Sequence, residues 1–278
     1  MEKFDVNENY GFEEKKAKDW LNKQRTLVTC SRGILTQQRE LMMNLWSFLP
    51  HSKKDSKLEK AEVVEQLEDL CESRDCSNLL FFQSRGKNLY LWSCKYPDGP
   101  SVYYQLHNVV AAEDFKFLGN CLKGSRAFLS FDISFKAKPH MELIKNMLVD
   151  AFNIPKNHPK SMPFFDKVFS FNHIAETGTI CFRHYQINKK GSKVDDVELI
   201  EIGPRFDMQI IKIFDSFMGG KVLYSNEVYQ TPRSLRVKEK KDVTKKRIKK
   251  LKQKKEKEER TTANLKYEDN DSLDEFLG

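Results

Sequence analysis

The pattern of hydrophobic and polar positions changes several times along this chain, and the order of the changes repeats. Residues 26–30 have the compact apolar pattern of a strand, and apolar residues at helical spacing follow until Pro50. A second helical pattern comes next, and three strand patterns then occur at 78–83, 88–94 and 102–107. From residue 127 the same order recurs, with a helix introduced by Pro139 and strands at 167–171, 180–187, 197–202 and 206–214. This order predicts an α/β protein built of two similar halves, residues 26–118 and 119–232.

The last two strand patterns read as one long strand that is interrupted by Gly203 and Pro204. Proline removes a hydrogen-bond donor from a strand and glycine allows a bulge, so the pair predicts a kink. Arg205 lies at the bend. It is compatible either with a structural ion pair to Glu201 or Asp207, or with an arginine that faces RNA.

The run Glu201-Ile202-Gly203-Pro204-Arg205-Phe206 resembles the signature of the Brix domain family of eukaryotic ribosome assembly factors. The resemblance covers most of residues 25–232, through 29–57, 82–92, 120–132, 163–187 and 223–232. Within the family, the segments most similar to a large-subunit member are 31–33, 49–57 and 122–126. The chain departs from the usual pattern at Gln83, Ala127, Lys167 and Cys181, which bears on the local sheet surface more than on the fold.

The resemblance implies a fold of two halves, each similar to the anticodon-binding domain of certain aminoacyl-tRNA synthetases. It implies a nucleolar, non-enzymatic factor that binds precursor rRNA during maturation of the large (60S) ribosomal subunit. The implied partners are other nucleolar assembly factors, above all a homologue of the Epstein-Barr nuclear antigen binding protein. Two alternatives stay open: a protein-interaction scaffold that contacts RNA only through its tail, and a small-subunit factor of the same family.

The formal charge of +8 is unevenly distributed. Residues 236–260 hold 14 basic and 5 acidic side chains, whereas residues 261–278 hold 1 basic and 5 acidic. We therefore expect residues 233–278 to be a lysine-rich and then acidic tail, helical or disordered, and residues 1–25 to be a partly ordered extension. The six cysteines lack metal-site spacing, and neither a secretory leader nor a membrane span is expected.

Basic residues in turns and on strands are the candidates for RNA contact on the folded part. They share positions at βα turns, at a tight ββ turn or within motifs of the resemblance: Arg32, Lys53, Lys54, Lys57, Arg85, Lys87, Lys123, Arg126, Arg183 and Arg205. The turn at residues 31–33 would place a guanidinium beside free amides at a helix N-terminus, an arrangement that binds anions. Each candidate also has an ordinary structural or solvated interpretation.

No catalytic pattern is complete in this sequence. Residues 119–124 imitate the start of a P-loop, but Ser125 and Arg126 follow where lysine and Ser/Thr are required. The six histidines are scattered without metal-ligand spacing. Cys30 precedes a helix, with His107 as a conceivable base, but a buried strand cysteine is the simpler interpretation. We expect no enzyme activity, cofactor or metal; an RNA-modifying enzyme is the remaining alternative.

Overall fold

The structure is a computed structural model of the 278-residue chain, and it describes residues 24–59, 62–116, 119–121, 124–156, 158–189 and 197–274. The chain divides into two compact units, Met1–Val228 and Tyr229–Gly278. The predicted extension, residues 1–25, lies outside the described residues except for Gln24 and Arg25.

The elements of the first unit repeat in the predicted order. The first half contains β1 (Thr26–Cys30), α1 (Thr36–Phe48), β2 (Ser52–Lys54), α2 (Val63–Ser73), β3 (Asn78–Arg85), β4 (Asn88–Lys95), β5 (Ser101–Val110) and η1 (Ala112–Asp114). The second half contains β6 (Arg126–Phe131), η2 (Ile133–Lys136), α3 (Pro139–Phe152), β7 (Phe165–Ile174), β8 (Thr179–Lys189), β9 (Val197–Glu201), β10 (Arg205–Ser216) and β11 (Gly219–Ser225). The α/β class is therefore confirmed.

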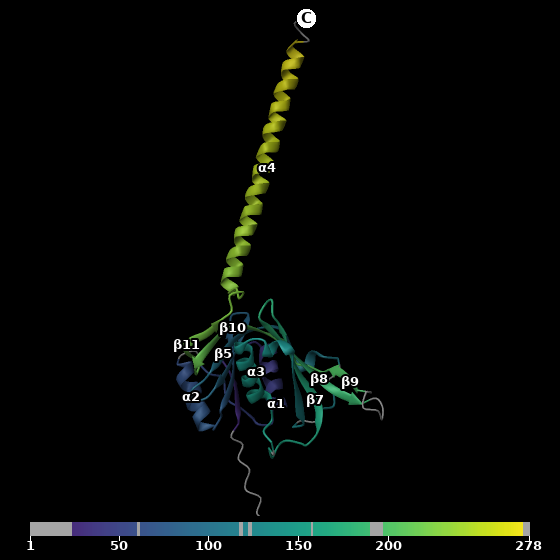
Figure 1. Ribbon diagram of the computed structural model, residues 1–278. Coiled ribbons are helices and arrows are strands. Elements are labelled where there is room, and N and C mark those ends of the chain that lie inside the picture. The colour runs from purple at the N-terminus through teal and green to yellow at the C-terminus, as the bar shows by residue number, and fades with distance from the viewer. Residues whose placement is uncertain are drawn as a thin grey trace, which may run out of the picture. The chain divides into compact units, whose positions relative to one another are not determined.

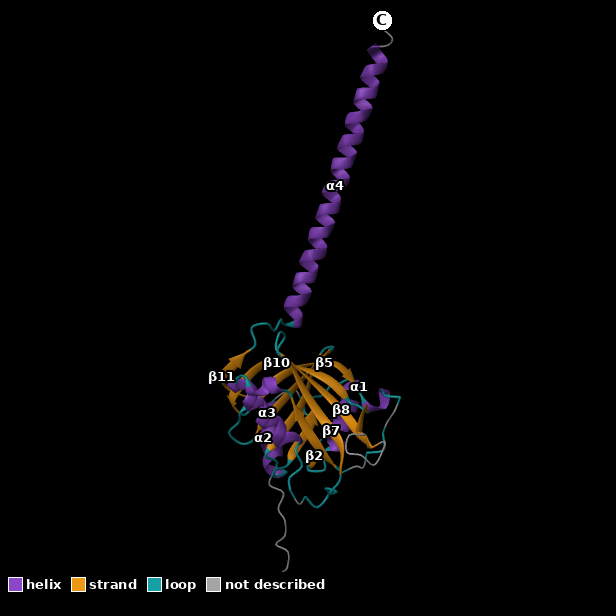
Figure 2. Ribbon diagram, turned by 45° about the vertical axis from the view of Figure 1, so that its right-hand side comes forward, coloured by secondary structure: helices purple, strands orange, loops and turns teal. Residues whose placement is uncertain are grey.

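All of these strands belong to one sheet, which curls through the first unit (Figure 1, Figure 2). The strand order is β2-β1-β3-β4-β5-β10-β8-β7-β6, with β9 paired to β8 and β11 paired to β10. In each half the first long strand pairs in parallel, β1 with β3 and β6 with β7, because a helical crossover separates the two. The antiparallel pair β5 and β10 joins the halves.

Two hydrophobic clusters cover opposite faces of this sheet, because successive strand residues point to opposite sides. On β3, Leu80 and Phe82 enter the larger cluster, which also holds the apolar faces of both α1 and α3. Leu79 and Phe81 enter the smaller cluster, which α2 covers with Leu67 and Cys71. The two halves therefore share one main core.

The predicted kink at Gly203 and Pro204 is confirmed. Strands β9 and β10 both run antiparallel along β8, and the short interruption between them contains Gly203. The amide of Ile202 still donates to the carbonyl of His184 at 3.0 Å, and the His184 ring is 2.5 Å from the Gly203 carbonyl oxygen. Gly203 has φ +66°, and a Cβ there would collide with the ring of Phe115. Only glycine fits this corner without strain.

Two strands were missed by the sequence pattern. The sequence pattern predicts no strand between residues 50 and 57, but Ser52–Lys54 form β2, because the outer edge of β1 offers free backbone groups. The hairpin strand β11 pairs with β10 although three of its seven residues are Gly219, Gly220 and Ser225. Short strands with few apolar residues carry little periodic signal.

The second unit contains one helix, α4 (Pro232–Asp274), in the lysine-rich region that was expected to be helical or disordered. An (i, i+4) ion pair joins Lys254 and Glu258 at 3.7 Å, a spacing that supports isolated helices. The acidic end at Leu273, Phe276 and Leu277 lies outside the residues whose side chains are described. None of the helices in the described ranges is long and apolar enough to cross a membrane.

Replacing Gly203 with alanine should destabilise the first unit by about 2–4 kcal/mol, because the new methyl group meets Phe115 and the backbone has positive φ. Gly33→Ala is the matched control: Gly33 also has positive φ, +85°, but no atom lies within 4 Å of its added Cβ. Its cost should stay near 1 kcal/mol. Urea unfolding measures both, and equal losses would show that the Phe115 contact does not constrain the corner.

Candidate nucleic-acid interface

The C-terminal end of α3 is held by side chains from the first half of the chain. The Ala151 carbonyl accepts hydrogen bonds from Thr26 Oγ1 at 3.2 Å and from the His51 ring Nε2 at 3.1 Å. The Asp150 carbonyl accepts from Asn78 Nδ2 at 3.2 Å. The last carbonyls of a helix lack partners within it, so these side chains supply them. The loop after α3 is thereby fixed beside β1 and β2.

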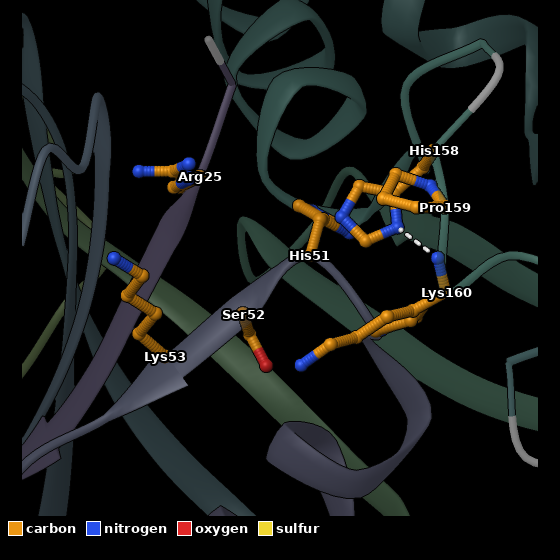
Figure 3. A pocket seen from close by; sticks show the side chains of 8 residues that line it. Arg25, His51, Ser52, Lys53, His158, Pro159 and Lys160 are labelled. Carbon is orange, nitrogen blue, oxygen red and sulfur yellow. Dashed lines mark hydrogen bonds between the residues drawn. The ribbon is translucent and has the colours of Figure 1, made fainter. Parts of the chain in front are cut away.

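A hollow of about 220 Å³ opens at this junction, and we call it the seam hollow (Figure 3). Its lining combines the start of β1, the entry to β2 and the loop after α3: Arg25, Pro50, His51, Ser52, Lys53, His158, Pro159 and Lys160. Three of these side chains are permanently cationic at neutral pH, and no carboxylate is among the described lining residues. Arg25 also forms an ion pair with Asp75 at 2.9 Å.

Both histidines of the seam hollow are held neutral by their surroundings. Burial lowers the pKa of His51 to about 4. The neighbouring His158 also lowers this pKa, whereas the hydrogen bond to Ala151 raises it. Burial and the charges of Lys160, Arg126 and Arg25 also lower the pKa of His158. The His158 Nδ1 accepts from the backbone amide of Lys160 at 3.2 Å (Figure 3). The positive charge of the hollow therefore comes from lysine and arginine alone.

The candidate residues of the first half lie in three places. Lys53 lines the seam hollow, with its Nζ 2.8 Å from the carbonyl oxygen of Arg74, which accepts its hydrogen bond. Lys54 lies over the Trp46 ring at 4.9 Å, and Lys57 is exposed nearby. Arg32 forms an exposed ion pair with Glu59 at 2.8 Å. Because α1 begins only at Thr36, the turn at 31–33 does not adjoin the helix N-terminus as expected.

Arg85 and Lys87 form a separate exposed turn between β3 and β4. The Arg85 guanidinium lies 5.7 Å from the Tyr90 ring centroid and 6.0 Å from that of Tyr103. Tyr90 is buried, and Trp92 packs against the smaller core cluster, so this aromatic group is mainly sheet packing. The turn itself remains accessible.

In the second half, the candidate arginines make contacts within the protein. Arg183 forms an ion pair with Asp207 at 2.9 Å and donates to two carbonyls, with 23% of its side chain exposed. Arg126 donates to the carbonyls of Ile154 and Pro155, at 3.3 and 2.8 Å. Arg205 is 46% exposed, lies over the Phe115 ring and is 3.8 Å from Glu201. Lys123 lies outside the described residues.

Sequence reasoning missed most of the seam hollow. Arg25, His158 and Lys160 are distant in sequence and sit in no motif, and only the pairing of β1 with β2 and the anchoring of α3 bring them together. His51 is not among the candidate RNA contacts predicted from sequence, yet it is 2% exposed and contacts α3. A single basic residue on a loop, such as Lys160, does not indicate a binding site by itself.

The described residues include no group of three or more His, Cys, Asp or Glu side chains that could hold a metal ion. Burial raises the pKa of the Cys30 thiol, against the nearby charges of Lys57 and Arg39, and Cys30 is 2% exposed. A buried thiol with a raised pKa is a poor nucleophile. The thiol is therefore part of the core.

The first unit is therefore an α/β protein with one sheet that spans both halves, and arginine and lysine line the seam hollow at their junction. Residues 31–212 match the Brix domain, and the chain belongs to the Brix domain family. It is 43% identical over 247 residues to the ribosome biogenesis protein BRX1 homolog of Dictyostelium discoideum, covering 88% of this chain and 75% of the relative.

Two further relatives have similar names. Identity is 40% to the ribosome biogenesis protein BRX1 of Saccharomyces cerevisiae (79% of this chain, 77% of the relative) and 41% to the human homolog (77% and 59%). The chain thus spans less than two thirds of the human relative. The crystal structure of a probable ribosomal biogenesis protein from Aeropyrum pernix K1 aligns with a TM-score of 0.46 at 14% identity, over 66% of this chain and 95% of that one. That likeness is too low to support the assignment.

The buried histidine predicts a pH dependence of stability. Because the pKa of His51 is about 4 when folded and 6.5 in its ordinary state, the unfolded chain binds the extra proton first as pH falls. The free energy of unfolding should therefore decrease as the pH falls from about 6.5 to 4. Below pH 4, His51 should contribute little further change. His51→Gln, which keeps a donor for the Ala151 carbonyl, should reduce the slope relative to that of the unmodified chain. Urea unfolding across this pH range measures both slopes, and an unchanged slope in His51→Gln would contradict the prediction.

Arginine replacements should separate structural from accessible cations. Arg183→Met should lower the free energy of unfolding by about 2–4 kcal/mol, because it leaves the 11%-exposed Asp207 carboxylate without its cation. Arg205→Met, at an exposed and longer ion pair, should cost less than about 1 kcal/mol. Chemical denaturation measures both, and a small loss for Arg183→Met would show that the pair contributes little to the fold.

Proposed function

We propose that this chain is a non-enzymatic ribosome assembly factor that binds precursor rRNA during maturation of the large (60S) ribosomal subunit. Membership of the Brix domain family and relatives named ribosome biogenesis protein BRX1 support the assembly role. The observation that carries RNA binding is the seam hollow, where Arg25, Lys53 and Lys160 converge and no carboxylate is among the described lining residues, although Arg25 also pairs with Asp75. Such clusters attract phosphates because they replace condensed counterions.

The site of action we propose is the nucleolus, beside other assembly factors of the particle. A homologue of the Epstein-Barr nuclear antigen binding protein is the partner that the family resemblance implies. The lysine-rich part of α4 adds sequence-independent attraction to RNA, since it carries most of the excess positive charge. Its composition also suits a nuclear-localisation signal.

A second candidate function is a protein scaffold that contacts RNA only through the tail. It is favoured by the internal engagement of Arg126 and Arg183, two of the ten candidate cations. A small-subunit factor of the same family is distinguished by the RNA it contacts. Ultraviolet crosslinking in cells, with sequencing of the RNA and mapping of crosslinked peptides, tests both. Large-subunit precursor RNA crosslinked through residues of the first unit supports the proposal, whereas tail-only crosslinks or small-subunit RNA contradict it.

Removal of residues 236–278 should leave measurable RNA affinity, because the sheet and core of the first unit stay complete. The affinity should fall, and log K should depend less steeply on log salt, by about 0.7 for each phosphate that the tail neutralises in the full chain. Fluorescence anisotropy at several salt concentrations measures both quantities. A tail-only binder would lose all affinity in this experiment.

A further inference from the structure

A second hollow lies beside the seam hollow and shares His158 with it. Its lining is Arg126, Lys156, His158, Ser161, Pro163 and Phe165, again without a carboxylate among the described residues. The two hollows together follow the loop from α3 to β7. They form a cationic path that ends at an aromatic side chain.

The aromatic end of this path faces outward because of a β-bulge. Strand β6 advances one residue, from Arg126 to Ala127, while β7 advances two, from Phe165 to Lys167. The extra residue, Asp166, shifts the alternation of side chains, so Phe165 points to the same face as its partner Arg126 while Lys167 points inward. Phe165 then stacks on Phe128, with ring centroids 4.5 Å apart and an interplanar angle of 24°.

This stacked pair is unusually accessible for phenylalanine. Phe128, on the terminal strand β6, is 51% exposed, and Phe165, on the neighbouring strand β7, is 48% exposed. In the first half, α2 covers the corresponding outer face. Helix α3 packs on the inner face of β6 and β7, but among the described elements of the first unit no helix covers their outer face. Exposed aromatic rings beside cations are the arrangement that binds unstacked bases and their phosphates.

We propose that the two hollows and the Phe128–Phe165 pair form one seat for single-stranded RNA, with a phosphate in the seam hollow and a base on the phenylalanine pair. The inference rests on the proposed RNA-binding function and names its substrate class. A duplex keeps its bases stacked inside and offers nothing to the rings. A protein partner fits less well, because lysine is depleted at protein interfaces, whereas Lys53, Lys156 and Lys160 line the two hollows.

The test compares a fluorescein-labelled single-stranded oligouridylate with a duplex RNA of equal length, using the full chain so that the tail contribution is constant. Phe128→Leu with Phe165→Leu should weaken single-strand binding about 5- to 100-fold, leave duplex binding unchanged and leave the salt slope unchanged. Lys53→Gln with Lys160→Gln should weaken binding and reduce the salt slope by about 0.7–1.4, because one or two phosphates are no longer neutralised. Two controls lie at exposed positions outside both hollows: the single variant Ile133→Ala and the double variant Lys212→Gln with Lys221→Gln. Each should change neither the affinity nor the salt slope.

Urea unfolding of each variant establishes that it is folded before binding is interpreted. Single-strand affinity that survives the phenylalanine replacements, or falls equally for the duplex, overturns the single-stranded seat. Retained RNA affinity with loss of a co-purifying assembly factor overturns it in favour of a protein-docking face. If the unmodified chain binds neither RNA, the proposed function itself fails, so the two failures are distinguishable.

Discussion

The hydrogen bonds at the C-terminal end of α3 are the interaction on which the arrangement of the first unit depends. A helix end buried among other elements needs partners for its last carbonyl groups, and here Thr26, His51 and Asn78 provide them from the first half. Because the carbonyl of Ala151 only accepts, the Nε2 of His51 must carry the proton, which fixes a neutral tautomer in a site where a charged ring would be costly. One set of contacts thus satisfies the helix and determines where the following loop lies.

A shared core and a shared strand pair also join the two halves of the first unit. The larger core contains apolar residues of both α1 and α3, and β5 pairs with β10 across the middle of a single sheet. Separating the halves would expose that core and break a central strand pair. The free-energy cost of each change opposes local opening. A hollow built across the junction is therefore rigid, which lowers the ordering cost when a ligand binds.

The local elements could be predicted from sequence, but the site could not. Periodicity placed the starts of β3, β4 and β5 within one residue, although β3 and β5 end two and three residues later than predicted. Gly203 with Pro204 marked the real interruption between β9 and β10. It could not reveal β2, whose residues Ser52–Lys54 are polar and form a strand only because β1 offers an edge. Nor could it reveal the extra residue at Asp166, because the predicted strand begins at Lys167 and the register of β6 against β7 is set only by their pairing. Pairing register is a tertiary property, and it decides which face a side chain uses.

Charge type on its own also fails to separate binding cations from structural ones. Arg183 and Lys160 are both cationic side chains. The guanidinium of Arg183 pairs with Asp207 and donates to two carbonyls, whereas Lys160 is exposed at the mouth of a hollow. An arginine inside a sheet can satisfy its fixed fork of donors with backbone oxygens, which suits a structural role. A lysine on a loop keeps its ammonium group hydrated, and its flexible side chain can still contact a ligand. Of the cations that line the seam hollow, Lys160 lies on the loop after α3 and Lys53 lies on the edge strand β2, so the anchoring of that loop brings them together.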